Sequence, residues 1–236
     1  VLDDLIRIEE NPAIRVTEFS IPKIIKAGLT SSKMRPIPFI TFALNYSLHQ
    51  YNVFGYHLVN IIIHILTGFF LYLFLKTTLE IPTVQQRYQH THLICFWAAL
   101  IWLIHPIQTQ SVTYIVQRMT SLSSMFFILS FLFYVYGRLA EENKKQWIWF
   151  IASAVALLLS LACKQISATL PFLIFLYEWY FFQDLSRSWL KRYWIWVVVI
   201  SIVFVLVVVL YLSGHPWDKI LAGYAVRDFT PLQRVL

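Results

Sequence analysis

The sequence predicts an all-α polytopic membrane protein, and three observations support this fold class. Of its 236 residues, 58% are hydrophobic and only 13% are charged, which is too apolar for a soluble domain of this length. Several apolar stretches approach or exceed the roughly 20 residues that a helix needs to cross a hydrocarbon layer. Because the bilayer core holds no water, the backbone groups of such stretches must be paired within helices.

About six stretches are expected to span the membrane. Five of them cover residues 56–79, 121–138, 147–163, 166–183 and 194–213. The sixth, residues 92–105, is about five residues short of a full crossing and is expected to recruit residues on either side.

The chain is therefore expected to have three regions. Residues 1–55 would form an external loop with short helices, because prolines and an Asn-Pro pair interrupt this stretch. Residues 56–213 would form the transmembrane domain, and 214–236 would start a further external loop. The chain begins without Met and stops near the start of another element, so we expect it to be part of a longer protein.

The basic residues of the loops predict the orientation. Loops after the first, third and fifth spans contain eight Lys and Arg residues, whereas the intervening loops contain only Arg118 and Lys164. The first set of loops is expected to be cytoplasmic. Residues 1–55 would then face the periplasm or exterior of a bacterial inner membrane, or of an equivalent membrane.

The net charge of +7 does not indicate nucleic-acid binding. The basic residues are spread over loops and termini and form no stripe with interleaved aromatic residues. Membrane lipids with anionic headgroups are the expected partners.

Carboxylates are distributed unevenly along the chain. Asp3 and Asp4 stand at the head of the polar stretch that leads into the apolar region. The acids that follow the first span mostly fall at or beyond the ends of apolar runs, where a solvated charge costs little. The external loop is therefore the main place where carboxylates could meet a substrate.

Polar residues at the outer membrane boundary form two further groups. His57, Asn60 and His64 share one helix face, which would either pack on a neighbouring helix through hydrogen bonds or line an outward-facing cavity. Residues 105–121 are polar and interrupted by Pro106, so they cannot form a plain spanning helix. They would form an amphipathic segment among the headgroups, or hold a phosphate and a sugar through His105, Gln108, Tyr114, Gln117 and Arg118.

Two cations are the remaining candidates. Lys164 lies in a short connection between two apolar stretches, and Arg35 precedes the first span. Each would either extend into the headgroup layer or act as a counter-ion for an anionic lipid phosphate.

Ordered sequence blocks resemble a known family. They are Asp-Asp followed by Asn-Pro-x-Ile, Arg-Pro-x-x-Phe-x-Thr-Phe-Ala-Leu-Asn-Tyr, Phe-Gly-Tyr-His-Leu-Val-Asn, His-Pro-x-Gln-Thr-Gln-x-Val-Thr-Tyr-Ile-x-Gln-Arg and Ala-Thr-Leu-Pro. From Asp3 to about Leu176 the chain resembles tetratricopeptide-repeat (TPR) membrane proteins, which include bacterial members and the animal transmembrane and TPR O-mannosyltransferases. They belong to the GT-C glycosyltransferase superfamily.

The resemblance implies a partial GT-C-like membrane domain, with TPR repeats beyond its C-terminal end. The expected activity is transfer of a sugar from a polyprenyl-phosphate-linked donor to a hydroxyl of a protein or glycan acceptor on the external face. Asp3 would be the general base and Asp4 a supporting acid. Relatives commonly have Lys-Glu where this chain has Lys164 and Gln165, so the activity could be altered or lost.

The remaining candidates have distinct roles in this scheme. Cations and hydrogen-bond donors would stabilise the departing phosphate, with Arg35, Arg118 and Lys164 as the cations and His105 as a donor. These residues allow a divalent metal without requiring one. A catalytically degenerate membrane anchor for TPR repeats is the alternative function. A lipid or solute transporter is the third, less favoured because no ionisable residue lies near the middle of a span.

Overall fold

A computed structural model describes residues 4–32, 35–86, 88–195, 198–199 and 202 of the chain. The chain divides into two compact units, Val1–Ile174 and Phe175–Leu236. The first unit contains most of the described helices.

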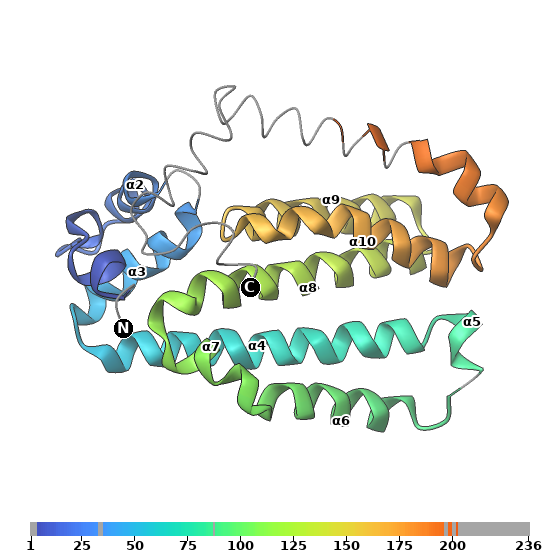
Figure 1. The fold of residues 1–236 in the computed structure, drawn as a ribbon, viewed down its shortest axis with the longest axis horizontal. Coiled ribbons are helices and arrows are strands. Elements are labelled where there is room, and N and C mark those ends of the chain that lie inside the picture. The colour runs from blue at the N-terminus through green and yellow to red at the C-terminus, as the bar shows by residue number, and fades with distance from the viewer. Residues whose placement is uncertain (1–3, 33–34, 87, 196–197, 200–201, 203–236) are drawn as a thin grey trace, which may run out of the picture. The chain divides into compact units, whose positions relative to one another are not determined.

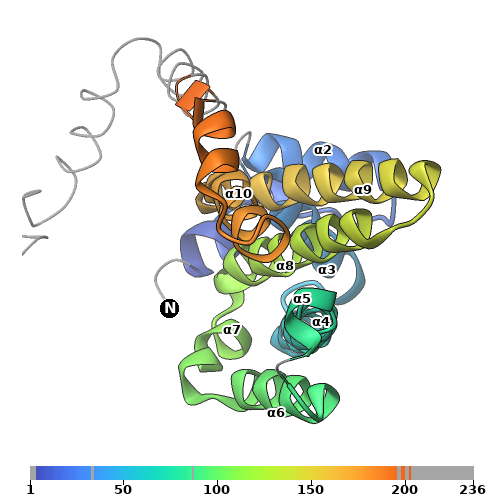
Figure 2. The same cartoon turned by 90° about the vertical axis from the view of Figure 1, so that its right-hand side faces the viewer.

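Four long helices form the body of the first unit (Figures 1 and 2). In chain order they are α4 (Val53–Leu79), α6 (Thr91–Ile104), α8 (Arg118–Leu139) and α9 (Asn143–Leu161). α4 packs against both α6 and α8, and α9 packs against the other side of α8. In Figure 1, α4 and α8 run in the same direction, whereas α6 and α9 run back.

The predicted spans at 56–79, 121–138 and 147–163 are confirmed as helices of membrane-spanning length. Among the described residues, three helices are long and apolar enough to cross a membrane: α4, the segment Ile115–Leu139 and α9. A fourth candidate combines Thr91–Ile104 with Pro106–Thr113, which meet at a bend of 52°. The straight helix predicted at 92–105 ends before Pro106, which cannot donate a backbone hydrogen bond, and the bent pair forms either a broken span or a re-entrant loop.

The remaining two predicted spans, 166–183 and 194–213, are not observed as single spanning helices among the described residues. The stretch 166–183 divides into the 3-10 helix η5 (Gln165–Thr169), α10 (Leu170–Tyr177) and the π-helix η6 (Glu178–Phe182). None of these pieces is long enough to cross a membrane as a single straight helix. Most of the predicted 194–213 span lies outside the described residues.

Helices of 14 residues or fewer occupy the N-terminal region before α4. They are η1 (Leu5–Glu9), η2 (Pro12–Ile14), α2 (Ile21–Ser31) and α3 (Pro36–His49). Proline occupies the first or second position of η2, α2 and α3, where its fixed φ suits a helix and its missing N–H has no partner to lose. Ile14, Phe39, Phe42 and Tyr56 anchor these helices on the start of α4.

α2 and α3 come unusually close together at Gly28. A Cβ atom at this position would lie 2.9 Å from the backbone nitrogen of Ile40 and 2.9 Å from the backbone oxygen of Pro36. Contacts this short exclude any side chain, so glycine is required for the two helices to pack.

Small polar residues form the seam between α8 and α9. Ser130 and Ser153 each donate a hydrogen bond to the other's backbone oxygen over 2.8 Å. Seven residues earlier in α8 and seven residues later in α9, Ser160 donates to the backbone oxygen of Ser123 over 2.7 Å. The spacing of seven keeps these contacts on one face, and the small side chains let the helices approach closely.

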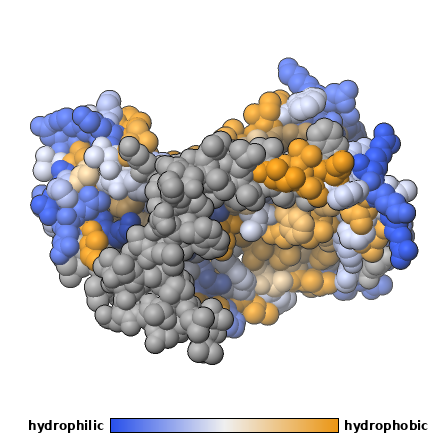
Figure 3. All heavy atoms as spheres, turned by 45° about the horizontal axis from the view of Figure 1, so that its top comes forward, coloured by the Kyte–Doolittle hydropathy of each residue, from blue (hydrophilic) through white to orange (hydrophobic). Residues whose placement is uncertain are grey.

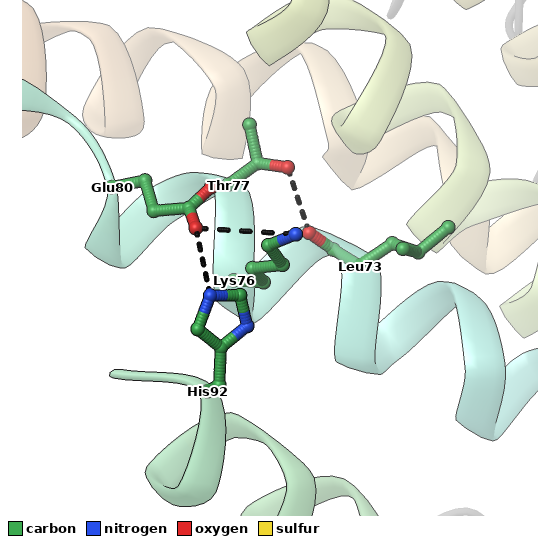
Figure 4. Close-up of polar contacts among 5 residues, drawn as sticks. All are labelled: Leu73, Lys76, Thr77, Glu80 and His92. Atoms are coloured by element: carbon green, nitrogen blue, oxygen red, sulfur yellow. Dashed lines mark hydrogen bonds and ion pairs between the residues drawn. The ribbon is translucent and has the colours of Figure 1, made fainter. Parts of the chain in front are cut away.

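The C-terminal end of α4 carries side chains of opposite charge (Figure 4). Glu80 lies 4.0 Å from the ammonium of Lys76 and 3.7 Å from the imidazole of His92. Nearby, Thr77 donates a hydrogen bond to the oxygen of Leu73, one turn earlier in the helix. α5 (Pro82–Gln85) follows in the connection to α6.

Aromatic side chains make several of the contacts within the second unit. Phe175 stacks on Trp189 with ring centres 5.1 Å apart, and the indole of Trp179 donates to the oxygen of Ser186. Residues 187–195 are helical. Figure 3 shows hydrophobic residues on the described surface between the two ends, while hydrophilic residues gather at both the left and the right end.

Candidate functional site

The candidate site lies at the end of the first unit where α4 and α8 begin and α9 ends. The N-terminal short helices lie at this end as well (Figure 1). We call it the site end, and we call the end with Lys76, Glu80 and the α8–α9 connection the distal end.

Arg118 is the central anchor of the site end. Its side chain is fully buried at the start of α8. The guanidinium donates to Asn60 Oδ1 over 2.7 Å, to Asn45 Oδ1 over 2.6 Å and to the backbone oxygen of Tyr56 over 2.9 Å. It also lies 4.7 Å from the ring centre of Phe42. Neutral acceptors and an aromatic face thus hold this buried cation in place of a carboxylate.

The polar face of α4 packs on the bent segment. His57 Nδ1 lies 3.0 Å from the backbone oxygen of Val112, and His64 Nε2 lies 2.8 Å from that of Leu103. Asn60 donates to the backbone oxygen of Tyr114 over 3.4 Å while its own oxygen accepts from Arg118. Of the two interpretations offered by the sequence, helix packing through hydrogen bonds is the one observed.

Arg35 and Lys164 come together at the site end, although they lie far apart in the sequence. Gln165 Oε1 accepts from Arg35 Nε over 3.3 Å and from Arg35 Nη2 over 3.1 Å. Lys164 donates to the hydroxyl of Thr120 over 2.7 Å. Thr120 in turn donates to Gln117 Oε1 over 2.8 Å, which brings a third predicted position, after Arg35 and Lys164, into the same group of contacts.

We call Arg7, Arg35 and Lys164 the cationic cluster. Their positive charges are not neutralised by a carboxylate in the described part of the chain. No carboxylate among the described residues forms an ion pair with any of the three. Burial lowers the pKa of Arg35, and repulsion from Arg7 lowers it further. Burial likewise lowers the pKa of Lys164, with Arg35 contributing. Arg35 and Lys164 are half-buried and Arg7 is exposed, and neighbouring like charges of this kind favour a bound anion.

The acidic pair has one described member. Asp4 Oδ1 accepts a hydrogen bond from the backbone N–H of Val116 over 2.9 Å, just before Arg118. This contact ties the N-terminal segment to the start of α8 and leaves the second carboxylate oxygen of Asp4 without a bond to a described residue. Asp3, the predicted general base, lies outside the described residues.

The other predicted residues lie on the bent segment before α8. His105 is exposed, and its Nδ1 accepts from the backbone N–H of Ile107. Gln108 accepts from the hydroxyl of Ser111 over 3.4 Å. Tyr114 contributes its backbone oxygen to Asn60. No bond joins these side chains to Arg35 or Lys164 within the described residues.

Three members of the site were missed from the sequence as binding residues. Gln165 was considered only as a departure from relatives, whereas its amide is the acceptor for Arg35. Arg7 and Thr120 were not considered. The only available signal was that Gln165 directly follows a candidate cation.

Metal binding has no support from the described geometry. No group of three His, Cys, Asp or Glu side chains within the described ranges could hold a metal ion. Cys95 and Cys163 are both buried and unpaired.

Sequence comparison finds relatives among protein O-mannosyl-transferases. The chain is 31% identical to protein O-mannosyl-transferase Tmtc3 of Drosophila melanogaster over 158 residues, which is 61% of this chain and 17% of that protein. It is 29% identical to human TMTC2 over 154 residues, covering 64% of this chain and 17% of the relative. Human TMTC4 is 28% identical over 151 residues, 60% of this chain and 20% of the relative. The chain thus spans about a fifth or less of these relatives.

No family model matches the chain. No solved structure matches it either.

Proposed function

We propose that this chain, a relative of the TMTC protein O-mannosyl-transferases, forms the donor-binding part of a membrane glycosyltransferase. The main support is that Arg35 and Lys164 come together although their segments are about 130 residues apart in the sequence. Among the described residues, both side chains bond only to neutral partners. A polyprenyl-phosphate sugar donor supplies the missing negative charge. Its lipid chain would lie among the apolar helices, and its phosphate at the cationic cluster.

The arrangement of partners supports a phosphate at this position. Gln165 uses one oxygen to orient the Arg35 guanidinium without neutralising it, and Thr120 does the same for the Lys164 ammonium. Cations held by neutral acceptors keep their full charge for a ligand. A Glu at position 165 would instead form an ion pair with Arg35 and weaken its attraction for phosphate.

The proposed reaction is displacement at the anomeric carbon of the donor. An acceptor hydroxyl attacks this carbon and loses its proton to Asp3, and the bond from the carbon to the phosphate oxygen breaks. The leaving phosphate carries the charge that Arg35 and Lys164 stabilise. A positioned general base contributes about 10²–10⁴-fold to such a step. Asp4 holds the N-terminal segment beside the start of α8 through its hydrogen bond from Val116.

Arg118 has a structural role in this proposal. Its guanidinium is fully buried and held by Asn45, Asn60 and Tyr56, so no phosphate can reach it without opening the core. It fixes the start of α8, and with it Val116 and Thr120, beside the site. His105 and Gln108 remain proposed contacts for the sugar or the acceptor.

The orientation and assembly follow from the sequence and are proposals as well. From the basic loops we propose that the distal end lies in the cytoplasm and the site end on the external face, either periplasmic or lumenal. The remainder of a longer protein, expected to hold TPR repeats, would act with this region on a protein or glycan acceptor.

The direct test measures sugar transfer by the full-length protein reconstituted in nanodiscs, with a polyprenyl-phosphate mannose donor. Asp3→Asn is expected to abolish transfer while the unfolding temperature stays unchanged, and Lys145→Gln at the distal end serves as a matched control. Retained transfer by Asp3→Asn would eliminate the proposed base. An unaltered cellular phenotype for Asp3→Asn and Arg35→Gln, with loss on deleting the repeats, would favour the anchor function instead.

A further inference from the structure

A second polar site is formed by the N-terminal segment and the end of α3. Four side chains line a pocket of about 480 Å³: Glu9, Arg15, Tyr46 and Tyr51. Glu9 ends η1, Arg15 follows η2, Tyr46 lies in the last turn of α3, and Tyr51 lies in the connection to α4. The pocket volume falls in the range of small-molecule sites.

The backbone of Glu9 organises this pocket. Its carbonyl oxygen accepts from Arg15 Nη2 over 2.8 Å and from the hydroxyl of Tyr51 over 3.3 Å. The rings of Tyr46 and Tyr51 meet edge to face, with centres 5.0 Å apart. The segments that carry Arg15 and Tyr51 are therefore both bonded to the Glu9 peptide group, and the ring contact adds the end of α3, so the pocket is largely preformed.

The polar groups that line the pocket have hydrogen-bond donors and acceptors that other described residues do not use. The Glu9 carboxylate and the Tyr46 hydroxyl make no hydrogen bond or ion pair with any described residue. Arg15 uses one of its five N–H groups within this part of the chain. The pocket thus combines a strong acceptor, several donors and two aromatic faces.

This combination fits a neutral sugar better than an ion. One carboxylate and one guanidinium leave the pocket without net charge, so it offers a phosphate no attraction comparable to the cationic cluster. A pyranose ring presents hydroxyls that donate and accept, together with C–H faces that pack on aromatic rings. We infer that the pocket formed by Glu9, Arg15, Tyr46 and Tyr51 binds a pyranose sugar.

The inference deepens the proposed function, on which the choice of sugar rests. Arg7 and Glu9 lie two residues apart on η1, so the sugar pocket and the cationic cluster share one short element. The bound sugar would be the one carried by the donor phosphate or one already attached to the acceptor. Both sources present the same ring chemistry to the pocket.

The test measures binding of methyl α-D-mannopyranoside to the full-length protein in nanodiscs by saturation-transfer NMR. We expect saturable millimolar binding, weakened at least about tenfold by Glu9→Gln or by Tyr46→Ala. Glu10→Gln changes the neighbouring exposed carboxylate and is expected to bind as the wild type does. Glu9 is also exposed, so its substitution leaves the fold intact, which circular dichroism verifies.

The outcomes separate this inference from the proposed function. Displacement of the mannoside by polyprenyl-phosphate mannose would assign the pocket to the donor sugar, and simultaneous binding would assign it to a glycosylated acceptor. Absence of saturable binding, equal binding by Glu9→Gln, or equal competition by a free amino acid would overturn the inference. Sugar transfer without mannoside binding would overturn it while leaving the proposed function in place.

Discussion

Cations of α4 and α9 at the distal end contact carboxylates, whereas Arg118, Arg35 and Lys164 at the site end contact none among the described residues; on the N-terminal helices, the exposed Lys23 pairs with Glu18. At the distal end, Lys76 lies near Glu80 and Lys145 forms an ion pair with Glu142. At the site end, Arg118, Arg35 and Lys164 bind only amide, hydroxyl, backbone or sulfur acceptors among the described residues. Exposed ion pairs stabilise a protein by at most about 1 kcal/mol. Uncompensated, partly buried cations instead mark a place where charge is kept for a ligand or for anchoring the core.

The largest effect is expected for the buried anchor of the site end. Arg118→Met leaves several acceptors without donors, including the Asn45 and Asn60 oxygens. At roughly 1–3 kcal/mol for each unsatisfied buried group, we expect a loss of about 3 kcal/mol. The unfolding temperature should fall by about 6–12 °C, measured by intrinsic fluorescence in detergent. Lys145→Met at the distal end should shift it by less than about 2 °C, and equal stability of the two variants would contradict the anchoring role.

The next effect tests the close approach of α2 and α3. Gly28→Ala places a methyl group against the backbone of Ile40 and Pro36, so the helices must separate. Overpacking of this kind destabilises by about 1–3 kcal/mol. The measurement is the same thermal unfolding, with Thr30→Ala on the exposed side of α2 as the control. A wild-type unfolding temperature for Gly28→Ala would show that the helices do not pack as described.

A charge change at the site end should alter binding more than stability. Gln165→Glu places a carboxylate on Arg35, and we expect affinity for polyprenyl phosphate to fall about tenfold, equivalent to about 1.4 kcal/mol. The binding assay is microscale thermophoresis in nanodiscs. Glu80→Gln removes a carboxylate at the distal end and should leave the affinity unchanged. Tighter binding by Gln165→Glu would contradict the view that Gln165 preserves the charge of Arg35.

The smallest effect is the pH dependence of Lys164. Because burial and Arg35 lower its pKa, Lys164 loses its proton at a lower pH than an exposed lysine does. Affinity for a lipid phosphodiester, whose own charge is constant, should therefore fall as the pH rises through this lowered pKa. The unfolded chain holds this proton more tightly, so the Lys164 contribution to stability rises over the same pH range.

The Lys164→Arg variant sharpens this prediction. Arginine stays charged over the accessible pH range, so its affinity profile should be flat where that of the wild type falls. The two profiles are compared in titrations at fixed ionic strength. A wild-type profile as flat as that of Lys164→Arg would show that Lys164 does not contact the phosphate.

The sequence predicted the long helices well and the partners of the polar residues poorly. Three spans follow from apolar runs of sufficient length, and Pro106 marked the bend before α8. Whether His57, Asn60 and His64 would pack or line a cavity depended on the bent segment, which contacts α4 only in the folded chain. The stretch 166–183 reads as one apolar run, yet it divides into three helical types that no periodicity distinguishes.

The candidate site shows the same limit. Arg35, Lys164 and Arg118 could be selected because cations beside apolar stretches are uncommon, but the selection could not separate their roles. Arg118 is buried by Asn45, Asn60 and Phe42, which come from two other helices, whereas Arg35 meets Gln165 across 130 positions. Such long-range pairings are a property of tertiary packing, and a single sequence carries no local signal for them.

The central claim is that the cationic cluster binds the phosphate of a lipid-linked donor. The most direct measurement is the affinity of the full-length protein in nanodiscs for polyprenyl phosphate, comparing Arg35→Gln and Lys164→Gln with Lys145→Gln. We expect each site-end variant to bind at least about tenfold more weakly, because a charge-assisted hydrogen bond contributes about 1.5–3 kcal/mol. The distal variant should bind as the wild type does. Equal affinity of all three variants would contradict the claim.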